Sequence, residues 1–304
     1  MNEGSKNLPA SVAARLLDRA KATGDDYQVL LTSYCLERFL YRLGESGLRD
    51  RFLLKGAMLL RLWSEQPYRA TRDLDLLRRG DGAEDAIVRD LRSILATSVP
   101  DDAIAFDAES IRVEDIRQQE EYSGKRVTML ARCGRSRLPL QIDLGLGDAV
   151  WPAPRASTYP ALLGMPAPRV LTYPREAMVA EKLEALAVLG ERNSRIKDFF
   201  DLHFLATRFA FERVVLAESV RRTFERRRTP LPAEAPIGLT AAYWQNPSRP
   251  AQVRAFARRA GIGLPASYEI EYTRVLGAFL LPVLEDLRAG GSPSRTWNPG
   301  GPWN

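Results

Sequence analysis

Apolar and polar residues alternate along this chain with two different periods. A period near 3.6 residues is typical of an amphipathic helix, and it covers residues 9–22 and 26–43. The same period dominates the second half of the chain and predicts helices over 175–190, 194–209, 212–227, 249–261 and 266–288. Helices are therefore expected near the start of the chain and over most of its second half.

A period of two appears between these helical regions. In residues 70–77, Leu74 and Leu76 alternate with Asp73 and Asp75, which predicts a strand with one buried face. The other elements expected here are strands over 52–55, 111–113, 126–131 and 138–145 and helices over 57–64 and 84–96. The fold class expected is α+β, with a mixed sheet flanked by helices and a helical second half.

Proline and glycine mark the expected divisions of the chain. Five prolines in residues 151–169 indicate an irregular linker, and the Gly/Pro-rich end indicates a disordered tail. We expect an N-terminal helix (1–24), an α+β core (25–169), a helical domain (170–288) and the tail (289–304).

Composition narrows the class of protein. Hydrophobic residues make up 45% of the 304 residues and charged residues 27%, which is ordinary for a globular chain. The sequence contains no apolar run of about 18 residues and its start lacks the apolar stretch of a secretory signal. We therefore expect a cytoplasmic protein without a membrane partner, with Cys35 and Cys133 as thiols.

The scarcity of histidine and lysine limits the chemistry. His203 is the single histidine, so HExxH zinc sites are excluded, and neither GxxxxGK[ST] nor GxGxxG occurs. Only six of the 44 Lys and Arg residues are lysines, and the net charge is +6. Enzymatic chemistry would rest on carboxylates, lysines and arginines, and a polyanion such as nucleic acid is a plausible partner.

Asp73 and Asp75 form the strongest candidate site. Two strand residues separated by one other share a face and lie about 7 Å apart, so the pair could bind Mg²⁺. Asp143 belongs to another alternating strand, and three carboxylates could serve phosphoryl or nucleotidyl transfer. The alternative is a solvated strand face. Gly56, between a strand and a helix, could expose N–H groups to phosphate, or it could be an ordinary junction.

Two further clusters lie on the predicted helices. Lys182 occupies a largely apolar helix face, so it needs a counter-charge from a triphosphate, from aspartates or from neighbouring glutamates. Asp198 and Asp201 share one face of the next helix, where Lys197 could pair with Asp201. A salt-bridged helix without a catalytic role is the alternative.

Taken together, these segments resemble a known family. Residues 52–60, 71–76, 181–185 and 195–202 resemble, in this order, the motifs of the AbiEii/AbiGii toxin family of nucleotidyltransferase-like proteins, which includes the MenT-type toxins. The resemblance extends over roughly residues 10–285.

The resemblance implies a polymerase-β-like nucleotidyltransferase core with a helical C-terminal domain. It implies transfer of a nucleotide from an NTP to RNA, with the tRNA 3′ end as the acceptor, and a block of translation. It also implies Mg²⁺ or Mn²⁺ as cofactor and a cognate antitoxin as partner.

Site residues follow from the same resemblance. The metal ligands would be Asp73, Asp75 and Asp143, and the catalytic set would be Asp73, Asp75, Lys182 and Asp198. Lys182 would steady the triphosphate, and Asp198 would orient it or an acceptor group. The nucleotide-binding residues would be Lys55, Gly56, Ala57, Arg195 and Lys197. Arginines at 221, 222 and 226–228 would hold RNA.

One departure from the family pattern bears on nucleotide binding. The family usually has Gly-Ser or Gly-Gly where this chain has Gly56-Ala57, so one hydroxyl ligand for phosphate is missing. Three alternatives to RNA nucleotidyl transfer stay open: a kinase-type phosphotransferase of the same fold, a small-molecule nucleotidyltransferase and a non-catalytic nucleotide-binding module.

Overall fold

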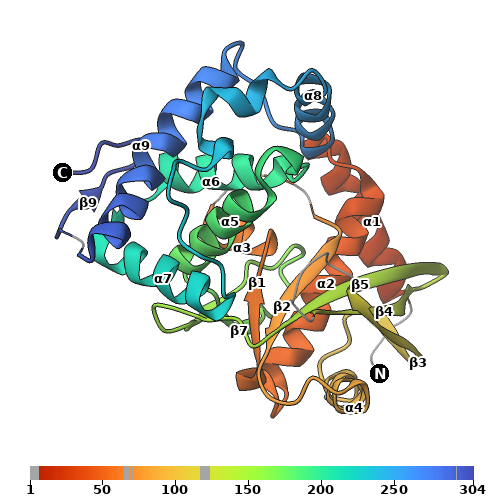
Figure 1. Cartoon of the computed structure of the whole chain (residues 1–304). Coiled ribbons are helices and arrows are strands. Elements are labelled where there is room, and N and C mark those ends of the chain that lie inside the picture. Colours follow the sequence, from red (N-terminus) through yellow and green to blue (C-terminus); the bar gives the residue numbers. More distant parts are fainter. Residues whose placement is uncertain (1–6, 65–68, 70, 117–123, 292) are drawn as a thin grey trace. The chain divides into compact units, whose positions relative to one another are not determined.

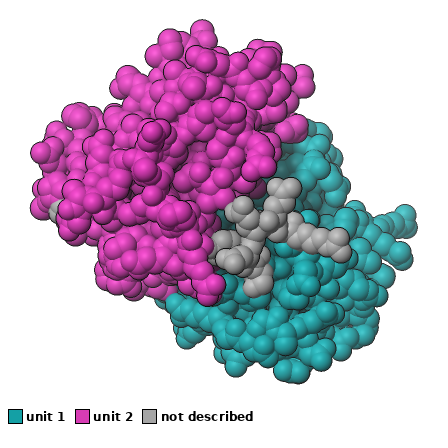
Figure 2. Space-filling view, in the orientation of Figure 1, with its two compact units in different colours: residues 1–147, 155–172 teal, residues 148–154, 173–304 magenta. Residues whose placement is uncertain are grey.

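The computed structural model describes residues 7–64, 69, 71–116, 124–291 and 293–304 (Figure 1). The chain forms two compact units (Figure 2). Unit 1 comprises residues 1–147 and 155–172, and unit 2 comprises residues 148–154 and 173–304. The first predicted helix belongs to unit 1, and the chain enters unit 2 for the second time after residue 172.

Unit 1 contains a mixed seven-stranded sheet with strand order β3-β4-β5-β2-β1-β7-β6. Its strands are β1 (Phe52–Lys55), β2 (Asp73–Arg78), β3 (Ile104–Ile116), β4 (Gly124–Cys133), β5 (Ser136–Leu146), β6 (Arg155–Thr158) and β7 (Arg169–Thr172). The β2–β5 and β1–β7 pairs are parallel, and the remaining neighbours are antiparallel. The expected α+β class is confirmed.

Most helices of unit 1 contact this sheet. They are α1 (Leu8–Thr23), α2 (Tyr27–Glu45), the short α3 (Met58–Leu62), α4 (Glu84–Leu95) and the 3₁₀ turn η2 (Arg49–Arg51). Asp26 caps α2 by accepting a hydrogen bond from the Val29 N–H at 2.9 Å. α2 contacts β7, β5 and α4 (Figure 1). Helix α3 is shorter than the expected 57–64.

Several polar residues of α2 are buried. Glu37 and Arg38 are fully buried, and Arg38 Nη2 lies 2.6 Å from Glu37 Oε1. Arg42 makes two hydrogen bonds to the Asp102 carboxylate, at 2.7 and 3.1 Å. A charge inside a protein is tolerated when a partner compensates it, so these arginines join the core as ion pairs.

The proline-rich stretch 151–169 contains more structure than the expected irregular linker. Residues 155–158 form β6 and pair with β7, which in turn runs parallel to β1. Prolines can start, flank or end edge strands because a missing N–H costs nothing there. Residues 148–154 therefore belong to unit 2, and residues 155–172, which follow them, complete the sheet of unit 1.

Unit 2 is mostly helical. Its helices are α5 (Arg175–Leu189), α6 (Ile196–Arg208), α7 (Arg213–Arg226), α8 (Arg249–Ala260) and α9 (Tyr268–Ala289), with 3₁₀ turns η3 (Gly190–Arg192), η4 (Ile237–Leu239) and η5 (Ala241–Gln245). All five predicted helices are present, with ends shifted by one or two residues. Among the described residues, no helix has the length and apolar character needed to span a membrane.

The C-terminal residues are packed, which differs from the expected disordered tail over 289–304. Thr296–Trp297 forms β9, which pairs with β8 (Phe211–Glu212). The Trp297 indole donates a hydrogen bond to the Ala206 carbonyl at 2.6 Å, and the Trp303 indole donates one to the Phe279 carbonyl at 3.0 Å. Both indoles are buried, because two large aromatic rings outweigh the local preference of Gly and Pro for disorder.

Candidate active site

Strands β2 and β5 bring two predicted carboxylates side by side. Their parallel register pairs Asp75 with Asp143, and adjacent strands lie about 4.8 Å apart. Asp73 is exposed, whereas Asp75 and Asp143 are half-buried. Leu74 and Leu76 are fully buried on the opposite face of β2 and hold the strand in this register. The acids therefore lie at the surface of a rigid sheet.

Gly56 makes room for the Asp75 carboxylate. It follows β1 with φ of +67°, in the left-handed region that favours glycine. A Cβ added at Gly56 would lie 2.0 Å from Asp75 Oδ2, which is too close for any contact. Lys55, next to it, faces Asp75 in the antiparallel β1–β2 register. The close approach explains the glycine without invoking a phosphate.

The expected phosphate site at the start of the helix after Gly56 is not supported. Ala57 is buried and precedes α3, which has only five residues. A helix this short sums few peptide dipoles, so the partial charge at its start is small. The nucleotide-binding role of Lys55, Gly56 and Ala57 remains a prediction from the resemblance.

Arg126 on β4 completes this part of the sheet. Its Nε and Nη2 groups each donate a 2.9 Å hydrogen bond to the Asp143 carboxylate, and the Gln141 side chain donates a third at 3.2 Å. The hydrogen bond to Asp143 is the largest cause of a raised Arg126 pKa; burial opposes it, and the charges of Asp143 and Asp73 add to it. Arg126 was not among the predicted site residues, although a strand was predicted over 126–131.

A divalent cation fits the β2 carboxylates better than it fits all three acids. Mg²⁺ is commonly held by one or two carboxylates, with water and phosphate oxygens filling the other positions. Asp73 and Asp75 supply such oxygens, whereas Arg126 engages both oxygens of Asp143. Within the described parts of the chain, no three acidic, histidine or cysteine side chains are grouped closely enough to hold a metal. The donor set therefore fits one cation on β2.

Lys182, Asp198 and Asp201 form a buried cluster in unit 2. Lys182 on α5 donates hydrogen bonds to Asp198 at 2.7 Å and to Asp201 at 2.8 Å, both on α6. Both aspartates are fully buried, and the Lys182 side chain is 11% exposed. Arg195 Nε lies 2.7 Å from Asp198 Oδ2. The two buried aspartates are thus balanced by the buried Lys182 and by Arg195, whose side chain is half-buried.

The protonation of this cluster follows from its charge pairs. Burial alone would lower the pKa of Lys182, but Asp198 and Asp201 raise it above the ordinary value. Burial would likewise raise the pKa of Asp198, but Lys182 and Arg195 hold it below the ordinary value. The sequence suggested that Lys197 could pair with Asp201. Instead, Asp201 accepts a hydrogen bond from Lys182, and Lys197 is exposed on α6.

The arginines expected to hold RNA on α7 are largely paired. Arg221 and Arg222 both donate hydrogen bonds to Glu218, and the bond from Arg221 is the largest cause that lowers the Glu218 pKa to about 2. Arg227 donates a hydrogen bond to the buried Glu184 at 2.7 Å. Helix α7 therefore offers less free positive charge than its sequence indicated.

Helix α8 carries the better candidate for a basic surface. Arg254, Arg258 and Arg259 are exposed. Residues 246–267 contain no Asp or Glu, so no carboxylate of this segment neutralises these arginines. Arg254 and Arg258 are four residues apart and share a helix face.

Unit 1 thus combines a mixed sheet flanked by helices with carboxylates paired on β2 and β5 at the sheet surface. The family model for the nucleotidyl transferase AbiEii toxin of type IV toxin–antitoxin systems matches residues 38–277. The chain belongs to this family and is a nucleotidyltransferase, and the expected family and enzyme class are confirmed.

Two solved structures show likeness at 14% sequence identity. One is JHP933 from Helicobacter pylori, with a TM-score of 0.46 over 87% of this chain and 95% of that one. The other is an H. pylori protein described provisionally as a nucleotidyltransferase, with a TM-score of 0.41 over 77% of this chain and 96% of that one. No protein with a curated description matches the chain.

Proposed function

We propose that this nucleotidyltransferase toxin transfers a nucleoside monophosphate from an NTP to RNA, with the 3′ end of tRNA as the acceptor. The observation that carries the proposal is the pairing of Asp75 with Asp143 beside Gly56, on a rigid sheet surface that a substrate can reach. The acceptor hydroxyl oxygen forms a bond to the α-phosphorus, the bond to pyrophosphate breaks, and the hydroxyl proton passes to water.

Each residue of the sheet surface has a part in this proposal. Asp73 and Asp75 would hold Mg²⁺, which would neutralise charge on the phosphates when bound. Asp143 fixes the Arg126 guanidinium through two hydrogen bonds, so that this positive charge lies beside the site. Gly56 keeps the space that the Asp75 carboxylate occupies.

RNA as acceptor is supported by charge. The chain carries a net charge of +6, and α8 exposes three arginines in a segment without carboxylates. Such a surface attracts a phosphate backbone and gives salt-sensitive binding. Membership of a type IV toxin–antitoxin family also supports an antitoxin as protein partner.

The test is a labelling reaction. Purified protein is incubated with total tRNA, Mg²⁺ and each α-³²P-NTP, beside the variants Asp75→Asn and Asp85→Asn. Asp85 is an exposed residue of α4, so its variant matches the charge change away from β2. We expect label in tRNA with wild type and Asp85→Asn and none with Asp75→Asn.

Two further reactions sharpen the assignment. Periodate oxidation of the tRNA destroys its 3′-terminal diol, so label that persists would contradict the 3′ acceptor. Omission of Mg²⁺ with a chelator should abolish transfer. Absence of label from all four NTPs, together with transfer from γ-³²P-ATP, would replace the proposal with a phosphotransferase.

A further inference from the structure

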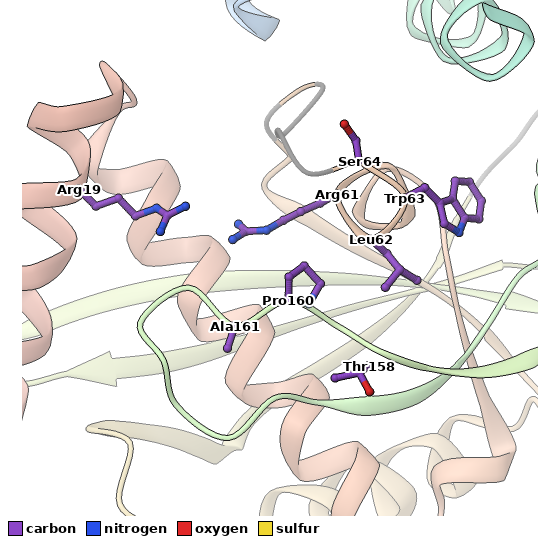
Figure 3. Close-up of a pocket in the computed structure, with 8 residues that line it drawn as sticks. All are labelled: Arg19, Arg61, Leu62, Trp63, Ser64, Thr158, Pro160 and Ala161. Carbon is purple, nitrogen blue, oxygen red and sulfur yellow. The ribbon is translucent and has the colours of Figure 1, made fainter. Parts of the chain in front are cut away.

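A cavity of about 400 Å³ in unit 1 has an excess of positive charge. Its walls come from α1, from α3 and the two residues after it, and from the end of β6 and the connection that follows. Figure 3 shows Arg19 of α1 and Arg61 of α3 extending their guanidinium groups toward each other. The other described lining residues are Leu62, Trp63, Ser64, Thr158, Pro160 and Ala161, and none of the eight is acidic.

The donors of these two arginines are mostly unused. Arg61 makes no hydrogen bond or salt bridge with any described residue. Arg19 donates one hydrogen bond to the Leu162 carbonyl at 3.2 Å, and its buried Nε has no partner among the described atoms. Two guanidinium groups that face each other repel, and a buried donor without an acceptor is costly. An anion between them would remove both costs.

The carboxylate whose charge interacts with Arg61 is already occupied. Arg61 acts electrostatically on Glu37. Glu37 accepts hydrogen bonds from Arg38 and from the Leu162 N–H, both at 2.6 Å, and is fully buried. Glu37 therefore has little capacity left to serve as the partner of Arg61 or Arg19, which leaves a place for the anion of a ligand.

We infer that this cavity binds a phosphate group, held between Arg19 and Arg61. Guanidinium groups match phosphate oxygens with paired hydrogen bonds and stay charged at all relevant pH values. The hydroxyls of Ser64 and Thr158 add polar contacts at the wall. The volume lies within the range of small-molecule pockets, so the rest of a nucleotide unit has room beside the phosphate.

The position of Arg61 favours a phosphate of the acceptor RNA as the occupant. Arg61 follows Ala57 by four residues of a short helix, which is about 6 Å along the helix axis. The cavity thus begins one helical turn from Gly56 and the proposed transfer site. This assignment to the acceptor rests on the proposed function, whereas phosphate binding itself does not.

Binding measurements with the full-length chain test the inference. The probes are a fluorescent single-stranded oligoribonucleotide and, separately, ATP, titrated against wild type, Arg61→Gln, Arg61→Lys and Arg132→Gln. Arg132 is exposed on β4, so its variant removes one charge from unit 1 away from the cavity. Arg61→Gln breaks no described contact, and thermal unfolding confirms that it folds.

We expect Arg61→Gln to weaken RNA binding about tenfold and to lower the slope of log K against log salt by about one. Arg61→Lys should recover part of the loss, and Arg132→Gln should bind RNA and ATP like wild type. Weaker RNA binding with unchanged ATP binding identifies an acceptor phosphate, and the reverse pattern identifies a nucleotide phosphate. Equal affinities of Arg61→Gln and Arg132→Gln for both probes would overturn the inference.

Titrations in an inactive variant test the phosphate site independently of the proposed transfer reaction. The same titrations are made with Arg61→Gln in the Asp75→Asn protein, which we expect to be inactive. A tenfold loss of RNA affinity there supports the phosphate site whether or not any NTP labels tRNA. Unchanged affinity in both backgrounds overturns the site even if transfer activity is present.

Discussion

Two groups of aspartates in this protein have opposite surroundings. In unit 2, Asp198 and Asp201 are fully buried, and Lys182 donates a hydrogen bond to each. In unit 1, Asp73 is exposed and Asp75 is half-buried on the surface of a sheet. By resemblance to the family, Asp73, Asp75 and Asp198 are candidate catalytic residues.

The difference in burial between the two groups determines which role an aspartate can have. A buried ion cluster is balanced by its own members, so moving one member toward a substrate would leave the others uncompensated. Carboxylates at a sheet surface keep contact with solvent and can exchange water for a ligand. The geometry favours holding α5 and α6 together as the role of Lys182, and its catalytic role remains a prediction.

Replacement of Lys182 is expected to have the largest effect on the stability of the protein. Lys182→Met leaves two buried carboxylates without their partner, and we expect a loss of about 3–5 kcal/mol in unfolding free energy. Urea unfolding followed by tryptophan fluorescence measures it, because Trp151, Trp244, Trp297 and Trp303, four of the five tryptophans, belong to unit 2.

Lys197→Met is the matched control for that experiment. Lys197 is exposed on α6, so the same substitution should change the unfolding free energy by less than about 0.5 kcal/mol. Wild-type stability of Lys182→Met combined with loss of nucleotidyl transfer would break the comparison and place Lys182 in catalysis.

Asp75→Asn should reduce transfer activity strongly and stability only slightly, the reverse of what we expect for Lys182→Met. Removal of one carboxylate from the proposed site should reduce transfer at least about 100-fold, because the charge that binds the cation and substrate is halved. The unfolding free energy should stay within about 1 kcal/mol of wild type, since Asp75 is only half-buried. Transfer rates and urea unfolding are measured on the same preparation. A large loss of stability would make Asp75 a structural residue like Asp198.

Local patterns in the sequence predicted the elements whose buried face is regular. The alternation of leucine and aspartate in β2 is reproduced by the burial of Leu74 and Leu76. The five helices of unit 2 also follow from periodicity. Strands β6 and β7 were missed because each has four residues and lies next to prolines, where the local signal favours a loop.

Pairing between distant residues explains what the sequence could not provide. The bonds from Lys182 to Asp198 and Asp201 join residues 16 and 19 positions apart. The bond from Arg126 to Asp143 depends on the β4–β5 register, and burial of Trp303 depends on α9. Composition and spacing identify which residues can pair, but only the fold selects the partner.

Gly56→Ala tests whether the aspartates of unit 1 depend on the position of the Asp75 carboxylate. A side chain at φ of +67° costs about 1–2 kcal/mol, and its Cβ would also displace the Asp75 carboxylate. We expect lower stability and reduced transfer together. Gly47→Ala is the control, because a Cβ there meets nothing within 4 Å. Full activity of Gly56→Ala would show that the position of Asp75 is unimportant.

The pH dependence of stability should give the smallest effect, and it tests what burial does on α6 to His203, whose Nε2 lies 3.0 Å from the Glu271 carboxylate. Burial is the largest cause of a lowered His203 pKa; Glu271 opposes it and Arg274 adds to it. The unfolded chain therefore binds more protons near pH 6.5, so stability is present above that pH and falls on acidification through the lower folded pKa. One proton limits the slope to about 1.4 kcal/mol per pH unit.

Urea unfolding between pH 5 and 8 measures this slope in wild type and in His203→Gln. Because His203 is the single histidine, the variant should lose the His-dependent part of the slope. An unchanged slope in His203→Gln would mean that burial on α6 does not disfavour charge. Charged partners outweigh burial at Lys182, whereas burial outweighs Glu271 at His203. That contrast would then fail, and with it the argument that partners keep Asp198 ionised against the effect of burial.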